Sequence, residues 1–406
     1  MLTRPLLLLM AVATGLTVGG NYVNQPLLDT IALSLAVPQG TAAALVTTAQ
    51  VSYGLGLLLV VPLGDLLERR RLLTVLALLA AAGHALCALA PSFAVLAVGT
   101  AVAGVFSVAA QVLVPFAAEL AEPGREGRAV GTVMSGLLLG ALLARSVSGV
   151  LADLAGWRAP YAVVALALVV LALVLRRRLP VSVPERVGGY AATLASTAAL
   201  VRTEPRLRTR ALLGAAGFAG VSVLFSSMTF LLAGERFGLG EAQIGLIGLA
   251  GAGAAAVASL AGRLADAGRG QLATGAGVLL FALAWVALGL SASGALTSLV
   301  LFVAGYALAD LALQAVHVSN QNVVYPLRPD ARARLNSAYM TTYFAGGALG
   351  SAVGSAAWIA GGWSAVTLAG AVLTVVVLGL WLVDVRVERR SRPAASPLSP
   401  AGADAR

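Results

Sequence analysis

The chain has 406 residues, of which 59% are hydrophobic and only 11% charged, and its formal net charge is +10. Soluble domains carry about 25% charged residues, and single cores stop growing near 250–300 residues, so this composition excludes a soluble enzyme and a disordered chain. All 27 basic residues are arginine and lie between apolar runs, which argues against a nucleic-acid partner. The composition therefore predicts a polytopic membrane protein embedded in the lipid bilayer.

Twelve apolar runs are long enough to cross a bilayer as helices, since one crossing needs about 20 mostly apolar residues. We expect the first run, which follows Arg4, to stay in the protein, because no small-residue cleavage site and polar mature chain come after it. The first six runs cover 5–27, 41–63, 72–90, 94–118, 129–152 and 160–176. The second six cover 210–233, 241–261, 271–291, 295–318, 335–359 and 364–384.

A segment rich in proline and arginine separates the two groups of six. If the N-terminus is cytoplasmic, 24 of the 27 arginines lie on the cytoplasmic side, which is the bias typical of cytoplasmic loops. The arginines thus predict a multi-pass protein of the inner (plasma) membrane with both termini in the cytoplasm. We expect an N-terminal six-helix bundle (1–178), a cytoplasmic linker (179–208), a C-terminal six-helix bundle (209–385) and a disordered cytoplasmic tail (386–406).

The two groups of six repeat each other at a nearly constant spacing. Gly140 and Trp157 in and after the fifth run correspond to Gly346 and Trp363 in and after the eleventh, 206 residues later. Two tandem six-helix units in parallel orientation are a known transporter architecture, with the substrate site between the halves. We therefore expect an all-α membrane protein with twelve transmembrane helices in two pseudo-symmetric six-helix bundles.

The turn between the second and third runs carries a motif that recurs between the eighth and ninth. The first copy holds Asp65, Arg69 and Arg70, and the second holds Asp266 and Arg269. Here the chain resembles the major facilitator superfamily (MFS), whose signature in this turn is G-x-L-x-D-x-x-G-R-[KR]. The resemblance implies a gate in which the aspartate binds a helix end and an arginine of the neighbouring half. The alternative is a positive-inside loop whose aspartate caps a helix.

Longer stretches, 21–28 and 314–322, look like the bacterial efflux-permease or drug:proton antiporter branch of this superfamily. The fifth run keeps the small-residue spacing of the antiporter motif G-x8-G-x3-G-P-x2-G-G, and small residues let helices approach closely. Ala144 and Arg145 replace its Gly-Pro pair, however, and Thr100 stands where drug antiporters place an arginine. The resemblance implies proton-coupled efflux, and these departures leave the substrate class open.

Polar residues recur every three or four positions along several runs, which is the spacing of one helix face. In the superfamily, the first, fourth, seventh and tenth helices line a central cavity. The alternative is that the stripes only bond neighbouring helices. We predict a substrate cavity lined by Asn21, Asn24, Gln111, Arg145, Ser226, Gln314, Tyr339 and Tyr343.

Arg145 and Asp310 are charges predicted to lie well inside the bilayer. A charge there costs at least about 2.5–3.5 kcal/mol, so Arg145 should face the interior and bind Asp29, Asn24 or an anionic substrate, unless it forms a structural ion pair. His317 lies two turns from Asp310 on the same helix face, and we predict that Asp310 and His317 couple proton entry to substrate exit. In the rival interpretation, Asp310 neutralises a cationic substrate or pairs with an arginine.

These patterns predict a secondary active transporter that works by alternating access as a monomer, exporting a small organic molecule in exchange for protons. A phosphate-binding loop needs a lysine, which the chain lacks, so ATP drive within the chain is excluded. No cofactor or metal is expected, since Cys87 is the only cysteine and the histidines, His317 and a structural His84, lie far apart. One alternative is proton-coupled uptake of a sugar or metabolite. A membrane-embedded sensor or enzyme is the other, although we find no catalytic constellation and predict no enzyme activity.

Overall fold

The computed structural model describes residues 2–122, 124–183, 189–291, 296–328 and 331–391. Within these ranges the regular structure is entirely helical, and ten helical segments are long and apolar enough to cross a membrane. Helices are expected here because lipid offers no hydrogen-bond partner to the backbone, so each crossing segment must satisfy its own N–H and C=O groups. The all-α membrane fold predicted from the sequence is confirmed.

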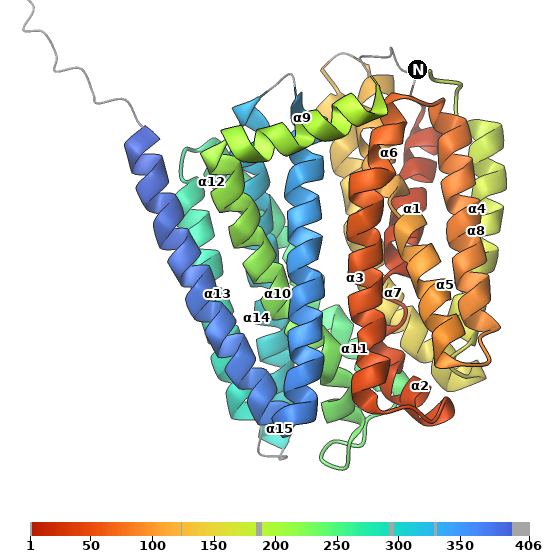
Figure 1. The fold of residues 1–406 in the computed structure, drawn as a ribbon, viewed down its shortest axis with the longest axis vertical. Helices are drawn as coiled ribbons and strands as arrows, with labels where there is room; N and C mark the ends of the chain where they lie inside the picture. The colour runs from red at the N-terminus through yellow and green to blue at the C-terminus, as the bar shows by residue number, and fades with distance from the viewer. Residues whose placement is uncertain (1, 123, 184–188, 292–295, 329–330, 392–406) are drawn as a thin grey trace, which may run out of the picture.

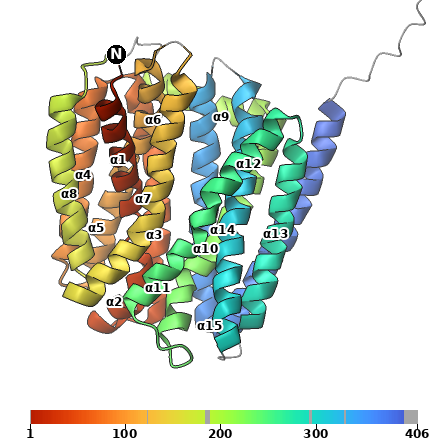
Figure 2. The same cartoon turned by 180° about the vertical axis from the view of Figure 1, so that it is seen from behind.

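The helices up to Arg178 pack together as one group on one side of the molecule (Figures 1 and 2). Helix α1 packs on α7, α4 packs on α5 and α8, and α3 packs on α5. Pro5 and Pro160 stand in the first turns of α1 and α8, where a missing N–H costs nothing. The elements are α1 (Arg4–Gly20), η1 (Gln25–Leu27), α2 (Leu28–Ser34), α3 (Gln39–Leu59), η2 (Val61–Asp65), α4 (Arg69–Ala88), α5 (Phe93–Phe106), α6 (Ala109–Leu120), α7 (Glu126–Ala155) and α8 (Ala159–Arg178).

A second group of helices follows, in which α10 packs on α15 and α13 packs on α14. Helix α10 is buried along nearly all of its length, because it also contacts η1, α2 and α3 of the first group. The elements are α10 (Pro205–Ala233), α11 (Glu241–Ile247), η3 (Gly248–Gly253), α12 (Ala254–Asp266), α13 (Gly270–Leu290), α14 (Leu296–Val324), η5 (Tyr325–Leu327) and α15 (Arg332–Ser391).

Helix α15 consists of two legs that meet at Gly361 and Gly362. Both residues have non-helical backbone angles, and the φ of +59° at Gly362 favours glycine. In Figure 1 both legs rise from this bend towards the top of the molecule and diverge from each other. The second broken segment is α11–η3–α12, where the sequence predicted one continuous run over 241–261 and the structure instead has a glycine-rich 3-10 turn. This broken segment is not among the ten that are long and apolar enough to cross a membrane.

Residues predicted to be linker and tail carry helices of their own. Helix α9 (Tyr190–Thr203) spans the top of the molecule between the two groups, on the same side as the N-terminus (Figure 1). We call this side the linker end and the opposite side, where α2 lies, the α2 end. The last helix continues to Ser391, five residues past the predicted start of the tail at 386, and residues 392–406 lie outside the described ranges.

Glycine seams join α1 to α7 and α10 to α15 at corresponding places in the two halves. A Cβ on Gly140 would lie 2.1 Å from the carbonyl oxygen of Gly15, and one on Gly346 would lie 2.2 Å from that of Ala215. Such separations are far below van der Waals contact, so only glycine permits these helix crossings. The pair Gly140 and Gly346, found in the sequence by its spacing, therefore occupies matching helix crossings.

We expect Gly140→Ala to destabilise the protein by at least about 1–3 kcal/mol, the usual effect of overpacking a close interface. The added methyl would meet backbone atoms, which cannot rotate away as a side chain could. Thermal unfolding of the purified variant measures the effect. Gly131→Ala on the same helix is the control, because its Cβ would have no neighbour within 4 Å, and an equal loss in both variants would contradict the seam.

Candidate substrate and proton site

Arg145 of α7 joins elements of both halves. Its guanidinium donates from Nε to Oε1 of Gln25 at 2.8 Å and from NH1 to the hydroxyl of Tyr306 at 2.8 Å. It also lies over the rings of Phe225, at 4.2 Å, and Tyr22, at 4.9 Å. Only 7% of Arg145 is exposed, so hydrogen bonds and cation–π contacts replace water around the charge.

Asp310 of α14 supplies the negative charge opposite Arg145. Its Oδ2 lies 3.7 Å from NH1 of Arg145, so the ion pair crosses between the halves without a short hydrogen bond. The glycines of η3 make room for it, since a Cβ on Gly251 would lie 2.2 Å from Asp310 Oδ2 and one on Gly248 would lie 3.3 Å from Cβ of Arg145. Glycine is a weak helix former, so the residues that give the two charges room also weaken the predicted 241–261 helix where the 3-10 turn occurs.

The partners that the sequence suggested for Arg145 lie elsewhere. Asp29 accepts a hydrogen bond from Gln39 at 2.9 Å, and Asn24 donates to the carbonyl of Leu45. Gln25, the residue next to Asn24, reaches Arg145 instead, because α1 ends at Gly20 and the chain turns before η1. A continuous helix over 5–27 was predicted, and this break turns successive side chains in different directions.

The halves touch on both sides of the Arg145–Asp310 pair. Towards the α2 end, Thr30 donates to Glu241, Thr229 donates to the carbonyl of Gln25, and Trp358 donates to Gln39. Towards the linker end, the amide of Asn336 donates to Gln111 at 3.0 Å. The central charges are thus enclosed between two layers of contacts that an alternating-access motion would have to break in turn.

His317 belongs to a cluster separate from Asp310. Its Nδ1 is hydrogen-bonded to the hydroxyl of Tyr339 at 3.0 Å, and its ring centroid lies 4.8 Å from that of Tyr343. Tyr343 in turn stacks on Phe218 at 4.3 Å. Asp310 faces Arg145 and lies about 10 Å along α14 from His317, at 1.5 Å per residue. The predicted Asp310–His317 partnership is therefore not a direct contact.

The other predicted cavity residues are spread over the molecule. Asn21 and Asn24 line a small pocket inside the first group of helices. Gln111 lies towards the linker end, where it accepts from Asn336. Ser226 is buried and donates to a carbonyl of its own helix, and Gln314 is half-buried on α14. The structure therefore brings only Arg145, of the predicted cavity set, into contact with Asp310.

The first gating turn is anchored within its own half, and through Asp65 it also interacts electrostatically with Arg334 of the other half. Glu68 caps α4 by accepting from the backbone of Arg70 and Arg71, and the buried Arg69 donates to the carbonyl of Gly64 and pairs with Glu119 of α6. Asp65 is exposed.

In the second gating turn, Arg269 precedes α13 and is exposed, and Asp266 ends α12. The side chain of Asp266 lies outside the described part of the chain. The predicted gate between the halves remains a prediction.

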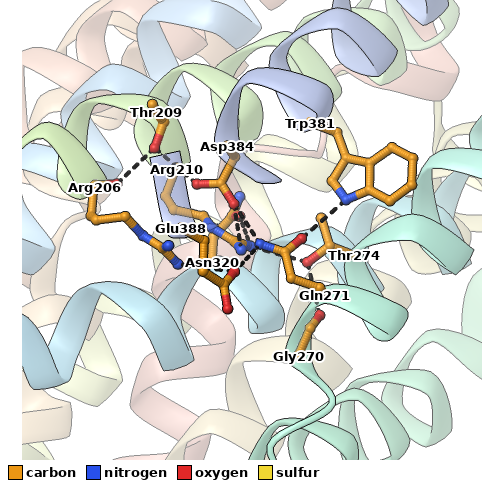
Figure 3. A network of polar contacts seen from close by, with 10 residues as sticks. All are labelled: Arg206, Thr209, Arg210, Gly270, Gln271, Thr274, Asn320, Trp381, Asp384 and Glu388. Atoms are coloured by element: carbon orange, nitrogen blue, oxygen red, sulfur yellow. Dashed lines mark hydrogen bonds and ion pairs between the residues drawn. The ribbon is translucent and has the colours of Figure 1, made fainter. Parts of the chain in front are cut away.

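A second buried ion pair, which the sequence did not reveal, lies at the linker end of the second group (Figure 3). NH2 of Arg210 lies 2.7 Å from Oδ2 of Asp384, and both residues are almost completely buried. Asp384 also accepts from Thr209 at 2.9 Å and from Gln271 at 2.7 Å. The pair therefore ties α10 and α13 to the second leg of α15.

This cluster, which we call the Arg210 network, reaches towards the middle of the molecule. Arg210 donates to Thr274 at 3.0 Å and to Oδ1 of Asn320 at 3.3 Å, and the amide of Asn320 donates to Tyr339. Sequence reasoning missed the network because Arg210 begins the seventh apolar run and Asp384 ends the last one, so neither stands out as a charge within a span. An arginine and an aspartate 174 residues apart carry no spacing signal.

Comparisons with known proteins agree with the fold. The sequence profile of the Major Facilitator Superfamily matches residues 10–320. The chain is 47% identical over 380 residues to the uncharacterized transporter YgaY of Escherichia coli O157:H7, covering 94% of this chain and 95% of that one. It is 31% identical over 290 residues to a chloramphenicol resistance protein of Streptomyces lividans, covering 70% and 73%.

A solved structure shows the same fold at low sequence identity. The crystal structure of a bacterial homolog of the human lysosomal transporter Spinster, in an inward-facing and occupied conformation, superposes with a TM-score of 0.73 at 17% identity, covering 96% of this chain and 98% of that one. The sequence profile, the relatives and the helical architecture lead to one conclusion: this chain is a membrane transporter of the Major Facilitator Superfamily.

Proposed function

We propose that this transporter exports a small organic molecule across the bacterial inner membrane in exchange for protons, by alternating access. The observation that carries the proposal is the Arg145–Asp310 pair, in which Arg145 is buried and Asp310 half-buried, and which crosses between the halves at 3.7 Å. The similarity to a chloramphenicol resistance protein supports export of an organic compound. We take the predicted orientation, with the linker end in the cytoplasm, as part of the proposal.

The geometry supports a simple coupling cycle. While Asp310 is charged, it neutralises Arg145 and keeps the halves in contact at the centre. A proton on Asp310 would remove that attraction and leave Arg145 with Gln25, Tyr306 and the two aromatic rings, so the halves could separate more easily. The exposed guanidinium could then bind an electron-rich group of the substrate. Proton uptake and substrate binding would thus act on the same pair of charges.

Transport by everted membrane vesicles tests the proposal. We expect an efflux-deficient host that expresses the protein to grow at higher concentrations of at least one compound from a panel that includes chloramphenicol. Everted vesicles from that host should accumulate the compound when their interior is acidified, and collapse of the pH gradient should release it. Protection from no compound, together with gradient-driven accumulation of a nutrient by intact cells, would contradict export and favour uptake.

We expect Asp310→Asn to abolish accumulation driven by a pH gradient and to preserve exchange of labelled for unlabelled substrate. The amide has the shape of the carboxylate but cannot release a proton, and Arg145 keeps its bonds to Gln25 and Tyr306. Vesicle uptake with and without a gradient measures both activities. Asp29→Asn is the control, since Asp29 bonds Gln39 near the α2 end, and it should keep gradient-driven accumulation. Gradient-driven accumulation in the Asp310 variant would overturn this role.

A further inference from the structure

A small pocket lies inside the first group of helices, and neither Arg145 nor Asp310 lines it. It has a volume of about 10 Å³ and lies between α1, α3, α4, α5 and α8. A cavity of about 10–15 Å³ holds one water molecule when it offers two to four polar partners. The residues that line it are Gly20, Asn21, Asn24, Ala49, His84, Cys87, Thr100, Ala103 and Tyr161.

Three side chains bring unpaired polar atoms to this pocket. Both ring nitrogens of His84, Oδ1 of Asn24 and the hydroxyl of Tyr161 are buried, and none has a hydrogen-bond partner among the described residues. The exposed fractions of these residues are 2%, 4% and 2%. Buried polar groups without partners are costly, and structures rarely keep several of them together unless they share a bound molecule.

The size and chemistry of the pocket identify that molecule. The His84 and Tyr161 ring centroids are 6.2 Å apart and no direct bond joins the two side chains, so a small bridging group fits between them. No carboxylate lines the pocket, and its other titratable group, the Cys87 thiol, is bonded to Thr100. A neutral molecule with both donor and acceptor capacity is therefore required, and water is the one that fits the volume.

Glycine at position 20 keeps the space open. A Cβ there would lie 2.6 Å from Nε2 of His84, so any other residue would block the ring nitrogen. Gly20 is also the last residue of α1, immediately before the turn that carries Asn21 and Asn24 to the pocket and Gln25 to Arg145. The pocket and the central site thus lie on opposite sides of the same break in α1.

We propose that this pocket binds one water molecule shared by His84, Asn24 and Tyr161, and that the water fixes the break in α1 that presents Gln25 to Arg145. His84 is then a positioning residue that acts through the water and Asn24. This inference goes beyond the proposed function, because it holds whichever substrate or ion the transporter carries.

Thermal unfolding of the purified full-length protein gives opposite signs for a hydrated and a dry pocket. If water satisfies the hydroxyl, Tyr161→Phe removes a hydrogen bond and lowers the Tm by about 1–2 °C. If the pocket is dry, the same change removes an unsatisfied buried group and leaves the Tm unchanged or raises it. Ser107→Ala is the matched control, because it removes a buried hydroxyl outside the pocket. Ser107 is fully buried, its hydroxyl has no partner among the described residues, and it does not line the pocket.

Rescue by a conservative variant tests the positioning role of His84. We expect His84→Gln, which can still hydrogen-bond water, to keep a Tm close to wild type, and His84→Leu to lose several degrees. The double variant His84→Leu/Tyr161→Phe should lose less than the sum of the single variants, because both act on one water molecule. Additive effects, or a glutamine variant no better than the leucine variant, would overturn the proposal.

Hydroxyl-radical footprinting with an X-ray beam keeps the proposal testable if a variant fails to fold, since it uses the wild-type protein. Bound water generates radicals next to the residues that hold it, so Tyr161 and Cys87 should be oxidised despite their burial. Tyr53, equally buried at 2% exposure, is the internal reference. Oxidation of Tyr161 no faster than that of Tyr53 would contradict a water in the pocket.

Discussion

Replacing Arg145 by glutamine should reduce transport to about 1% of wild type or less. The change removes two charge-assisted hydrogen bonds, to Gln25 and Tyr306, each of which contributes about 1.5–3 kcal/mol. A loss of about 3 kcal/mol corresponds to roughly a hundredfold reduction in rate. Arg145→Lys should stay close to the glutamine variant, because a single ammonium cannot match the planar fork that reaches both partners. Uptake of labelled chloramphenicol into everted vesicles measures the effect.

Arg158→Gln is the control for this prediction. Arg158 is an exposed arginine next to the same helix, where it lies over Trp157 and donates to the carbonyl of Ala90. Its replacement should leave transport within about twofold of wild type, since exposed contacts contribute little. Transport by Arg145→Gln at the level of the Arg158 variant would remove Arg145 from the mechanism.

We expect Asp384→Asn to destabilise the protein by about 3–5 kcal/mol, the usual result of removing one partner of a fully buried ion pair. Arg210 would keep Thr274 and Asn320 as partners but lose its only ion-pair contact among the described residues. The variant should therefore accumulate poorly and unfold at lower temperature. Thermal unfolding and the yield of folded protein measure the effect.

Two further variants distinguish a structural ion pair from a surface one. Arg210→Met/Asp384→Leu should recover much of the stability that the single variant loses, because no unpaired charge stays buried. Glu122→Gln, which breaks the ion pair between the exposed side chains of Glu122 and Arg125, should change stability by less than about 1 kcal/mol. A double variant as unstable as Asp384→Asn would mean that the network stabilises the fold through something other than charge pairing.

The two ion pairs inside the membrane domain differ in a way that suits different tasks. Arg210 and Asp384 are 2.7 Å apart within one half, and further hydrogen bonds hold the carboxylate. Arg145 and Asp310 are 3.7 Å apart and belong to different halves. A tight pair inside one bundle resists motion, whereas a looser pair between bundles can break when one charge is neutralised. The structure therefore separates a stabilising cluster from the proposed coupling pair.

Sequence patterns predicted the helices and the two central charges but not how these charges are paired. Arg145 and Asp310 stand out in the sequence because each interrupts an apolar run, and the cost of a charge in lipid makes such residues conspicuous. Their partnership depends on how α7 and α14 pack, which no local pattern specifies. Gln25 was missed because the turn after Gly20 redirects the chain, and an apolar run does not reveal such a break.

The positions of the breaks were equally hard to predict. Gly361 and Gly362 mark a visible loop between two apolar runs, and the chain bends there. The glycines of η3 looked like ordinary small residues of one span, yet they interrupt the helix where Asp310 and Arg145 need space. Hydropathy measures how much apolar surface a segment has, and it does not sense a backbone that yields to charges on neighbouring helices.

The most direct test measures the distance between the halves as a function of pH. Spin labels at Leu33→Cys in α2 and Leu246→Cys in α11, both exposed near the α2 end, can be placed in a Cys87→Ala background. When every other position keeps its native residue, we predict two populations of the distance between the labels, and their proportions should change between acidic and alkaline pH. Asp310→Asn should hold one proportion at every pH, with the longer distance favoured. An Asp310→Asn variant that keeps the pH dependence of the parent would contradict a proton-controlled link between Arg145 and Asp310.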